Sequence, residues 1–266
     1  MCPDGWILED ARFQVARVAR ELCLGFYYRH DPRPPKDWSE TRRNWLSFVR
    51  EIIETSDQYD SYKPVFDAVH RGHLPLGKPL LDAWLAIEPS FTPNTVCTWL
   101  SNHALDLCAK WGKDGGIIWT HREEFARALE HATGWAFFSD GGLDSKGRSI
   151  EEIKDRTIIA SNDSCGVGKN LQYVWSRNLE TCFSSSAGRT EQRIGRTHRE
   201  GQKDHTVYVD YLVGCRESCD AIYRAYDRAG KVETETKLPQ KLRLATILWP
   251  ELDKCSGPAF ASNSRK

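Results

Sequence analysis

The sequence lacks any apolar run that approaches the ~20 residues needed to span a bilayer. Its amino terminus, MCPDGWILEDARF, carries acidic residues where a secretory signal needs an apolar stretch. The nine cysteines are scattered and odd in number, which is typical of proteins in a reducing compartment. We therefore expect a cytoplasmic protein that makes no contact with a membrane.

The chain also lacks an excess of either charge, because 37 basic residues balance 37 acidic residues. Any anionic partner must therefore be held by local clusters of basic side chains and not by the overall field. Cys215 and Cys219 lie four residues apart, but no second cysteine or histidine pair stands nearby at zinc-finger spacing. We expect no metal site made by this chain alone.

A complete ATP-hydrolysing site is missing as well. The segment GVGK ends at Lys169, but a P-loop needs glycine where Asp163 stands and serine or threonine where Asn170 stands. The other Gly-Lys pairs are followed by Pro79, Asp114 and Val232. The chain has no Asp-Glu dipeptide that could bind magnesium as a helicase-type Walker B. It cannot assemble an ordinary ATPase site by itself.

The first part of the chain has a helical pattern. Apolar residues recur at helical spacing from Trp45 to Ile53, and DWSE at 37–40 is a capping-box signature just upstream. A stronger apolar stripe runs from Val96 to Trp111 and predicts a second such helix, with His103 as a core histidine. We expect a helical region at 1–112, a second domain at 113–250 and a tail at 251–266.

After residue 112 the pattern changes to short apolar runs that alternate with helical segments. The runs are GIIWT, WAFFS, TIIAS, LETCFSS and HTVYVDYLV. Strands that alternate with helices predict an α/β domain with a parallel sheet covered on both faces. Ligands of such sheets bind at the carboxyl ends of the strands. This rule selects THREE at 120–124, SNDSCGVGKNL at 161–171 and the loop before the arginine-rich segment.

The arginine-rich segment is EQRIGRTHREGQ at 191–202. Gln192, Arg196 and Arg199 are spaced by four and three residues, which places them on one face if the segment is helical. Two guanidinium groups aimed the same way suit a polyphosphate or a nucleic-acid backbone. The alternative is a solvated helix face. Upstream, Gly166 and Gly168 allow a ligand to approach a turn whose backbone amides can cradle phosphate.

Three segments together resemble a known family. GGIIWTHREEF, IIASNDSCGVGKNLQ and EQRIGRTHREGQ, in this order, look like motifs IV, V and VI of superfamily-2 helicases. The last is similar to the variant seen in remodeller-type double-stranded-DNA translocases and their phage relatives. The resemblance covers roughly residues 113–215, and motif V departs from the usual pattern at Asn162 and Asp163. The first hundred residues look like the helical material that phage helicases carry between their lobes.

The resemblance implies that the chain is the second of two RecA-like lobes. Residues at matching motif VI positions would be arginine fingers, namely Arg196 and Arg199, with Gln192 orienting them or the phosphate. Residues at matching motif V positions would contact nucleic acid or couple it to the nucleotide: Gly166, Gly168 and Asn170. Residues of motif IV would line the surface that carries the nucleic-acid strand: Trp119, Thr120 and His121. For these three residues a purely structural role is the alternative, because Trp119 ends an apolar strand and could serve only to pack the core.

Two hypotheses follow for the function. In the first, the chain is half of a nucleic-acid-dependent ATPase, and ATP and Mg²⁺ bind only together with a partner that carries the first lobe. In the second, it is a non-catalytic binding or regulatory module that has abandoned ATP hydrolysis. It keeps the surface that binds nucleic acid, which is DNA or RNA. A chain without function is a third interpretation.

Overall fold

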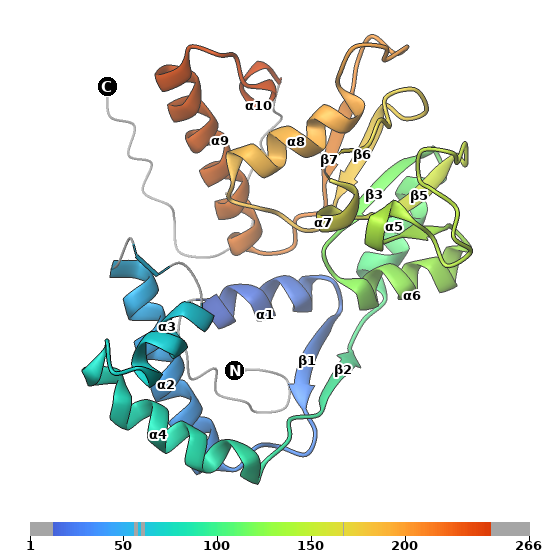
Figure 1. Ribbon diagram of the computed structural model, residues 1–266. Helices are drawn as coiled ribbons and strands as arrows, with labels where there is room; N and C mark the ends of the chain where they lie inside the picture. The colour runs from blue at the N-terminus through green and yellow to red at the C-terminus, as the bar shows by residue number, and fades with distance from the viewer. Residues whose placement is uncertain (1–12, 56–57, 60–61, 167, 246–266) are drawn as a thin grey trace.

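The computed structural model describes residues 13–55, 58–59, 62–166 and 168–245. Its larger part is a five-stranded sheet with its covering helices, and its smaller part is a helical cluster at the far end of a two-stranded ribbon (Figure 1). The predicted tail at 251–266 lies outside the described residues.

The sheet is parallel throughout, with strand order β4-β5-β3-β6-β7. Central strand β3 is buried along its whole length, as expected for a parallel strand that is covered on both faces. This arrangement confirms the predicted α/β class. The strands are β3 (Gly116–Thr120), β4 (Phe137–Phe138), β5 (Thr157–Ser161), β6 (Arg177–Glu180) and β7 (Tyr208–Tyr211).

Helices cover both faces of this sheet. On one face, α5 (His103–Gly112) and α6 (Glu123–Thr133) pack their apolar side chains against Ile118 and Ile159. On the other face, Ile117 and Trp119 belong to a second core, and α8 (Ala187–Thr197) docks there. The shorter elements are η3 (Asp140–Gly142) and α7 (Asn162–Cys165), and the chain continues into α9 (Arg216–Thr236) and α10 (Lys241–Leu244).

The amino-terminal part is mostly helical, as predicted, but it also contains an antiparallel ribbon. The ribbon pairs β1 (Phe26–His30) with β2 (Thr95–Trp99), and a helical cluster with its own core lies between them in sequence. The helical elements of this part are α1 (Phe13–Cys23), α2 (Lys36–Thr55), α3 (Tyr62–His70), η1 (Pro75–Gly77), α4 (Lys78–Ile87) and η2 (Glu88–Ser90).

The prediction of a single helix from Val96 to Trp111 is wrong. Thr95–Trp99 is a strand, because its β-branched and aromatic side chains pair with FYYRH of β1, and α5 begins only at His103. His103 is exposed at that helix start and is not a core residue. The capping signature at 37–40 lies inside α2 and not upstream of it, because α2 begins at Lys36.

The predicted boundary at residue 112 separates α5 from the sheet on which it packs. Leu24 and Phe26 also belong to the core between α5, α6 and the sheet. Buried Glu21 forms an ion pair with Arg122, whose Nη2 lies 3.1 Å from Oε1, directly after β3. Residues 13–30 and 95–112 therefore pack with the sheet, and the separate helical cluster spans about residues 36–91.

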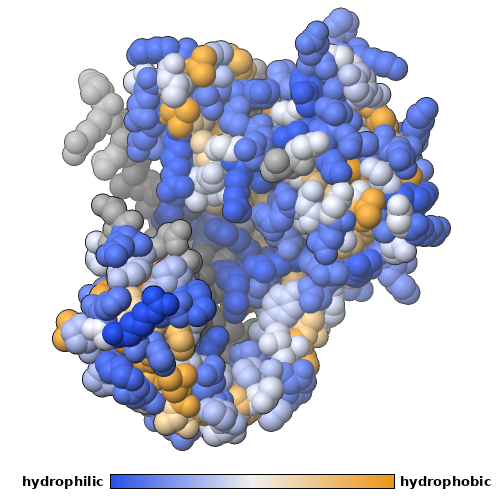
Figure 2. Space-filling view, in the orientation of Figure 1, coloured by the Kyte–Doolittle hydropathy of each residue, from blue (hydrophilic) through white to orange (hydrophobic). Residues whose placement is uncertain are grey.

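The visible surface is largely hydrophilic. Figure 2 shows apolar residues in separated patches between hydrophilic ones. None of the helices in the described ranges is long and apolar enough to cross a bilayer.

Truncating Phe26 tests whether β1 belongs to the sheet core. Phe26→Ala is expected to lower the free energy of unfolding of the sheet part by about 3 to 5 kcal/mol, because Phe26 is fully buried in that core. Leu76→Ala is the control, since Leu76 is 85% exposed, and it should change stability by less than about 0.5 kcal/mol. Urea denaturation followed by circular dichroism measures both. An unchanged main transition in Phe26→Ala would place β1 outside the sheet core.

Candidate functional site

The loops at the carboxyl ends of β3, β5 and β6 come together as predicted. His121 follows β3, and its Nδ1 lies 3.2 Å from Oδ2 of Asp163, which follows β5. The other carboxylate oxygen of Asp163 lies 3.9 Å from Nη1 of Arg189, in the first turns of α8. Burial lowers the pKa of His121, and the nearby Asp163 carboxylate opposes that shift.

The glycine-bearing loop after β5 needs its two glycines for different reasons. A Cβ on Gly166 would lie 2.3 Å from the carbonyl oxygen of Asn162, so no other residue fits there without a backbone shift. Gly168 has open space around it but a φ of +75°, a conformation that side chains other than glycine disfavour. The backbone conformation of this loop therefore requires glycine at both positions.

Arg196 holds this loop from α8. Its Nε donates to the carbonyl oxygen of Gly166 at 3.0 Å, and its Nη1 donates to that of Lys169 at 3.1 Å. The backbone amide of Leu171 donates in return to the carbonyl oxygen of Arg196 at 3.2 Å. The segments similar to motifs V and VI are thus joined by direct hydrogen bonds.

Arg199 contacts the same loop one residue further along. Its Nη1 donates to Oδ1 of Asn170 at 2.8 Å, and the backbone amide of Asn170 donates to Oε1 of Glu151 at 2.9 Å. Asn170 is therefore fixed from both sides. The side chain of Arg199 remains exposed.

The geometry that brings Gln192, Arg196 and Arg199 together differs from the prediction. Helix α8 ends at Thr197, so Arg199 lies in the turn beyond it and is not on the helix face. All three nevertheless line one cavity of about 420 Å³, because the chain folds back toward the loop after β5. In the described residues no hydrogen bond joins Gln192 to either arginine, so this structure does not show it orienting them.

The cavity has an excess of positive charge. It is lined by Glu191, Gln192, Gly195, Arg196, Arg199 and Lys241. Partial burial lowers the pKa of Arg196, and the neighbouring charge of Arg199 lowers it further. Within the described part of the chain, neither arginine has a carboxylate partner. An anion placed in the cavity would relieve the repulsion between them.

Arg193 and Glu180 form a buried ion pair that the sequence reasoning missed. Nε of Arg193 donates to Oε1 of Glu180 at 2.8 Å, and each side chain is only 5% exposed. Burial raises the pKa of Glu180, and the guanidinium of Arg193 opposes this. The buried face of α8 includes Thr190, Arg193 and Thr197. Their spacing by three and four residues is the sequence signal that could have indicated that Arg193 faces inward.

Trp119 and Thr120 do not line a surface, which corrects the prediction for both. Trp119 is fully buried, and its indole Nε1 donates to Oδ1 of Asn178 at 3.0 Å. Oγ1 of Thr120 accepts from the backbone amide of Arg122 at 3.1 Å, and Thr120 is 1% exposed. Both end a strand that is covered on each face. Of these three residues, His121 is the one whose side chain hydrogen-bonds to Asp163 in the loop after β5.

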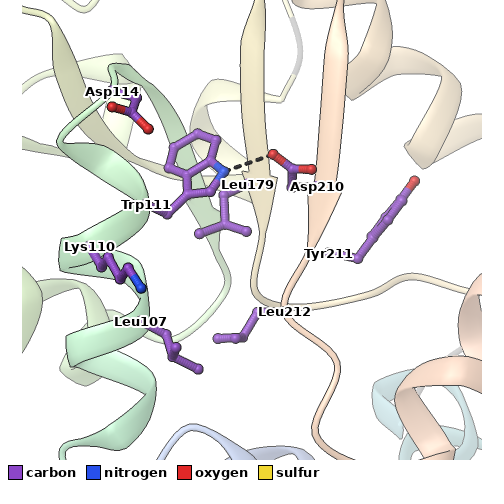
Figure 3. Close-up of a pocket in the computed structure, with 8 residues that line it drawn as sticks. All are labelled: Leu107, Lys110, Trp111, Asp114, Leu179, Asp210, Tyr211 and Leu212. Atoms are coloured by element: carbon purple, nitrogen blue, oxygen red, sulfur yellow. Dashed lines mark hydrogen bonds between the residues drawn. The ribbon is translucent and has the colours of Figure 1, made fainter. Parts of the chain in front are cut away.

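A second cavity, of about 370 Å³, lies between α5 and the edge strand β7 (Figure 3). Leucines form much of its wall, and Nε1 of Trp111 donates to Oδ2 of Asp210 at 2.7 Å. The guanidinium of Arg177 lies over the Trp111 ring at 4.8 Å. No predicted site residue lines this cavity, and its central polar groups already satisfy one another.

Among the described residues, no group of three or more histidine, cysteine, aspartate or glutamate side chains is arranged to hold a metal ion. The acid in the arginine-lined cavity is Glu191, and both of its carboxylate oxygens accept backbone amides of α10, at 2.8 and 2.6 Å. Among the described residues that line it, the cavity has three cations and one acid, so it suits an anion better than a cation.

No protein-family model and no curated protein sequence matches this chain. Among solved structures, it is similar to a variant of S. cerevisiae Dbp5 bound to RNA and ADP BeF3, at 18% identity and a TM-score of 0.38 over 46% of this chain and 35% of that chain. A variant of Dbp5 bound to Gle1 and IP6 shows 18% identity and a TM-score of 0.38 over 48% of this chain and 37% of that chain. The C-terminal part of the Fun30 ATPase domain is 12% identical to this chain, with a TM-score of 0.37. That match covers 83% of this chain and 81% of the Fun30 chain. The chain spans just over a third of these Dbp5 chains.

Removing the buried cation tests the ion pair beneath α8. Arg193→Met is expected to lower the free energy of unfolding by about 3 to 5 kcal/mol near pH 7.5, because it leaves the carboxylate of Glu180 buried and unpaired. Arg189→Met is the matched control on the same helix, since Arg189 is 65% exposed and lies 3.9 Å from its partner. Urea denaturation gives both values.

The loss caused by Arg193→Met should shrink toward pH 5. Without its cation, Glu180 has a folded-state pKa that is raised further above its unfolded value of 4.5. As pH rises past 4.5, the folded variant therefore keeps its proton while the unfolded chain loses it. Stability of the variant then falls with rising pH relative to the wild-type protein. An equal loss near pH 5 and pH 7.5 would argue against this account.

Proposed function

We propose that this chain is the second RecA-like lobe of a nucleic-acid-dependent ATPase that works with a separate first lobe. The observation that carries the proposal is the cavity in which Arg196 and Arg199 meet without a carboxylate partner in the described residues. Guanidinium groups in such a position suit the phosphates of a nucleotide held between two lobes. The resemblance of 191–202 to helicase motif VI supports the same role.

The two arginines have different parts in this proposal. Arg199 is the finger, because it is exposed and spends one donor on a neutral amide, which leaves the rest of its guanidinium for phosphate. Arg196 is the residue that fixes the loop, because two of its nitrogens donate to loop carbonyls. A supplied arginine finger is worth about 10³ to 10⁵ in rate, since it neutralises charge that develops in the transition state.

The loop after β5 would couple nucleic acid to the nucleotide. Gly166 and Gly168 shape a backbone that can approach a sugar-phosphate chain, while Asn170 is hydrogen-bonded to Arg199. A shift of the loop on binding nucleic acid would therefore move the finger directly. His121 and Asp163 lie beside the same loop, and we place His121 at the edge of the nucleic-acid surface. The motif pattern favours DNA, as in remodeller-type translocases.

ATP and Mg²⁺ would bind only with the partner lobe. This chain offers cations to the phosphates, and both carboxylate oxygens of the cavity's acid, Glu191, accept backbone amides of α10. The magnesium ligands and the P-loop lysine would come from the first lobe.

Mixing this chain with a first-lobe partner tests the proposal. The chain alone should hydrolyse no ATP, and the mixture should show turnover stimulated by DNA that Arg199→Ala lowers by about 10³-fold or more. Lys231→Ala, at an exposed lysine of α9 that pairs with Asp227, should leave turnover within about twofold, since surface ion pairs contribute little. Steady-state phosphate release measures each case.

Two outcomes would contradict this proposal. Turnover by the carefully purified chain alone would show that it needs no partner lobe. Binding of DNA that weakens steeply with salt but ignores both ATP and the partner would instead favour the non-catalytic nucleic-acid-binding module.

A further inference from the structure

Lys241 reaches the arginine-lined cavity from the carboxy-terminal part of the chain. It is the first residue of α10, 42 positions after Arg199 and outside the segment that resembles helicase motifs. Its Cε and Nζ each lie 3.9 Å from the point where a Cβ on Gly195 would stand. The ammonium group is therefore placed over the bare part of α8, beside Arg196.

The main chain at Lys241 is fixed by its surroundings. Oε2 of Glu191 accepts from the backbone amide of Lys241 at 2.8 Å, and Oε1 accepts from that of Leu242 at 2.6 Å. Leu242 is buried with Ala225 and Ala229 of α9. Helix α10 is thus held against α8 through the same acid that lines the cavity, and the base of the lysine side chain cannot move away from it.

Arg243 adds a further attachment to α9. Its guanidinium lies 4.3 Å from the centre of the Tyr226 ring, and its Nε lies 3.6 Å from Oε2 of Glu233. The guanidinium of Arg243 is therefore engaged by α9 and does not face the cavity. The ammonium group of Lys241 differs, because none of the described residues gives it a carboxylate or a hydrogen-bond partner.

Three cations therefore face one cavity that contains a single acid. Arg196 and Arg199 donate only to neutral oxygens, and Lys241 has no partner among the described residues. Glu191 directs both of its oxygens at backbone amides. Arg196 and Arg199 repel each other, and Lys241 lines the same cavity. An anion of several charges placed there would attract all three cations. Their number matches a chain of phosphates better than a single phosphate.

We propose that Lys241 is the third cation of a polyphosphate site and contacts the phosphate chain of the nucleotide together with Arg199. The proposal rests on the function proposed above and adds to it that α10 forms part of the nucleotide site. Lysine suits this place because its flexible stem carries a point charge that can follow the phosphates, whereas the arginines are held by the loop. Glu191 acts as the positioning residue, since it fixes the start of α10.

Binding of tripolyphosphate to the full chain tests this inference. Titration calorimetry at low salt, about 50 mM, keeps the electrostatic attraction from being screened. Lys241→Gln is expected to weaken binding by about tenfold or more, as expected for the loss of a hydrogen bond between charged groups. Lys241→Arg should restore most of the affinity, because the charge and the reach are kept. Lys231→Gln is the matched control, since Lys231 lies on α9 and pairs with Asp227.

Comparison with Arg199→Ala separates the inference from the proposed function. If wild-type protein binds tripolyphosphate and Arg199→Ala weakens it while Lys241→Gln does not, the role of Lys241 is overturned and the proposed function stands. If wild-type protein does not bind tripolyphosphate, the inference about Lys241 is overturned, and the proposed function is decided by the mixing experiment, because ATP binding there needs the partner lobe.

A parallel titration with a DNA oligonucleotide distinguishes the source of the phosphate. We expect Lys241→Gln to leave oligonucleotide affinity within about twofold of wild type, because Lys241 faces the cavity of the arginines. A loss of oligonucleotide affinity without a loss of tripolyphosphate affinity would assign Lys241 to the nucleic-acid backbone and overturn the inference.

Discussion

The site depends on the guanidinium of Arg196, which joins helix α8 to the loop after β5. Its two hydrogen bonds to the carbonyls of Gly166 and Lys169 fix that loop against the helix. Arg199 then meets Asn170 one residue further along the loop. Asn170 is held on its other side by Glu151. The predicted nucleotide contacts and the predicted nucleic-acid contacts are therefore parts of one hydrogen-bonded unit.

Helix α8 is unusual in that polar contacts hold much of it to the sheet. Apart from glycines, its apolar residues are Ala187 and Ile194. The buried pair of Arg193 with Glu180 and the bond between Thr197 and Asn178 take the place of a wide apolar face. Such contacts are directional, so they specify one orientation of the helix. A fixed orientation is what a helix needs if it presents a cation to a ligand.

Alternation of apolar runs with helical segments was enough to predict the parallel sheet and the meeting of its carboxyl-end loops. The same periodicity failed between Val96 and Trp111, where a strand and a helix follow each other with apolar residues at spacings that fit one helix. The strand exists because a distant partner, β1, pairs with it, and pairing across 65 to 73 positions leaves no local signal. Trp119 was assigned to a surface because of the resemblance to motif IV, with core packing as the alternative, and the structure buries it.

The sequence by itself determined which chemical groups could form a phosphate site: the order of the three motifs, the two glycines of the loop, and the arginines near residue 196. These follow from residue type and short spacing, which local physics controls. Only the tertiary structure decided their partners. It placed Arg199 beyond the end of α8 yet inside the cavity, turned Arg193 inward to Glu180, and brought Lys241 back beside Gly195. Contacts between segments tens of residues apart arise from packing and chain reversal, which residue spacing does not encode.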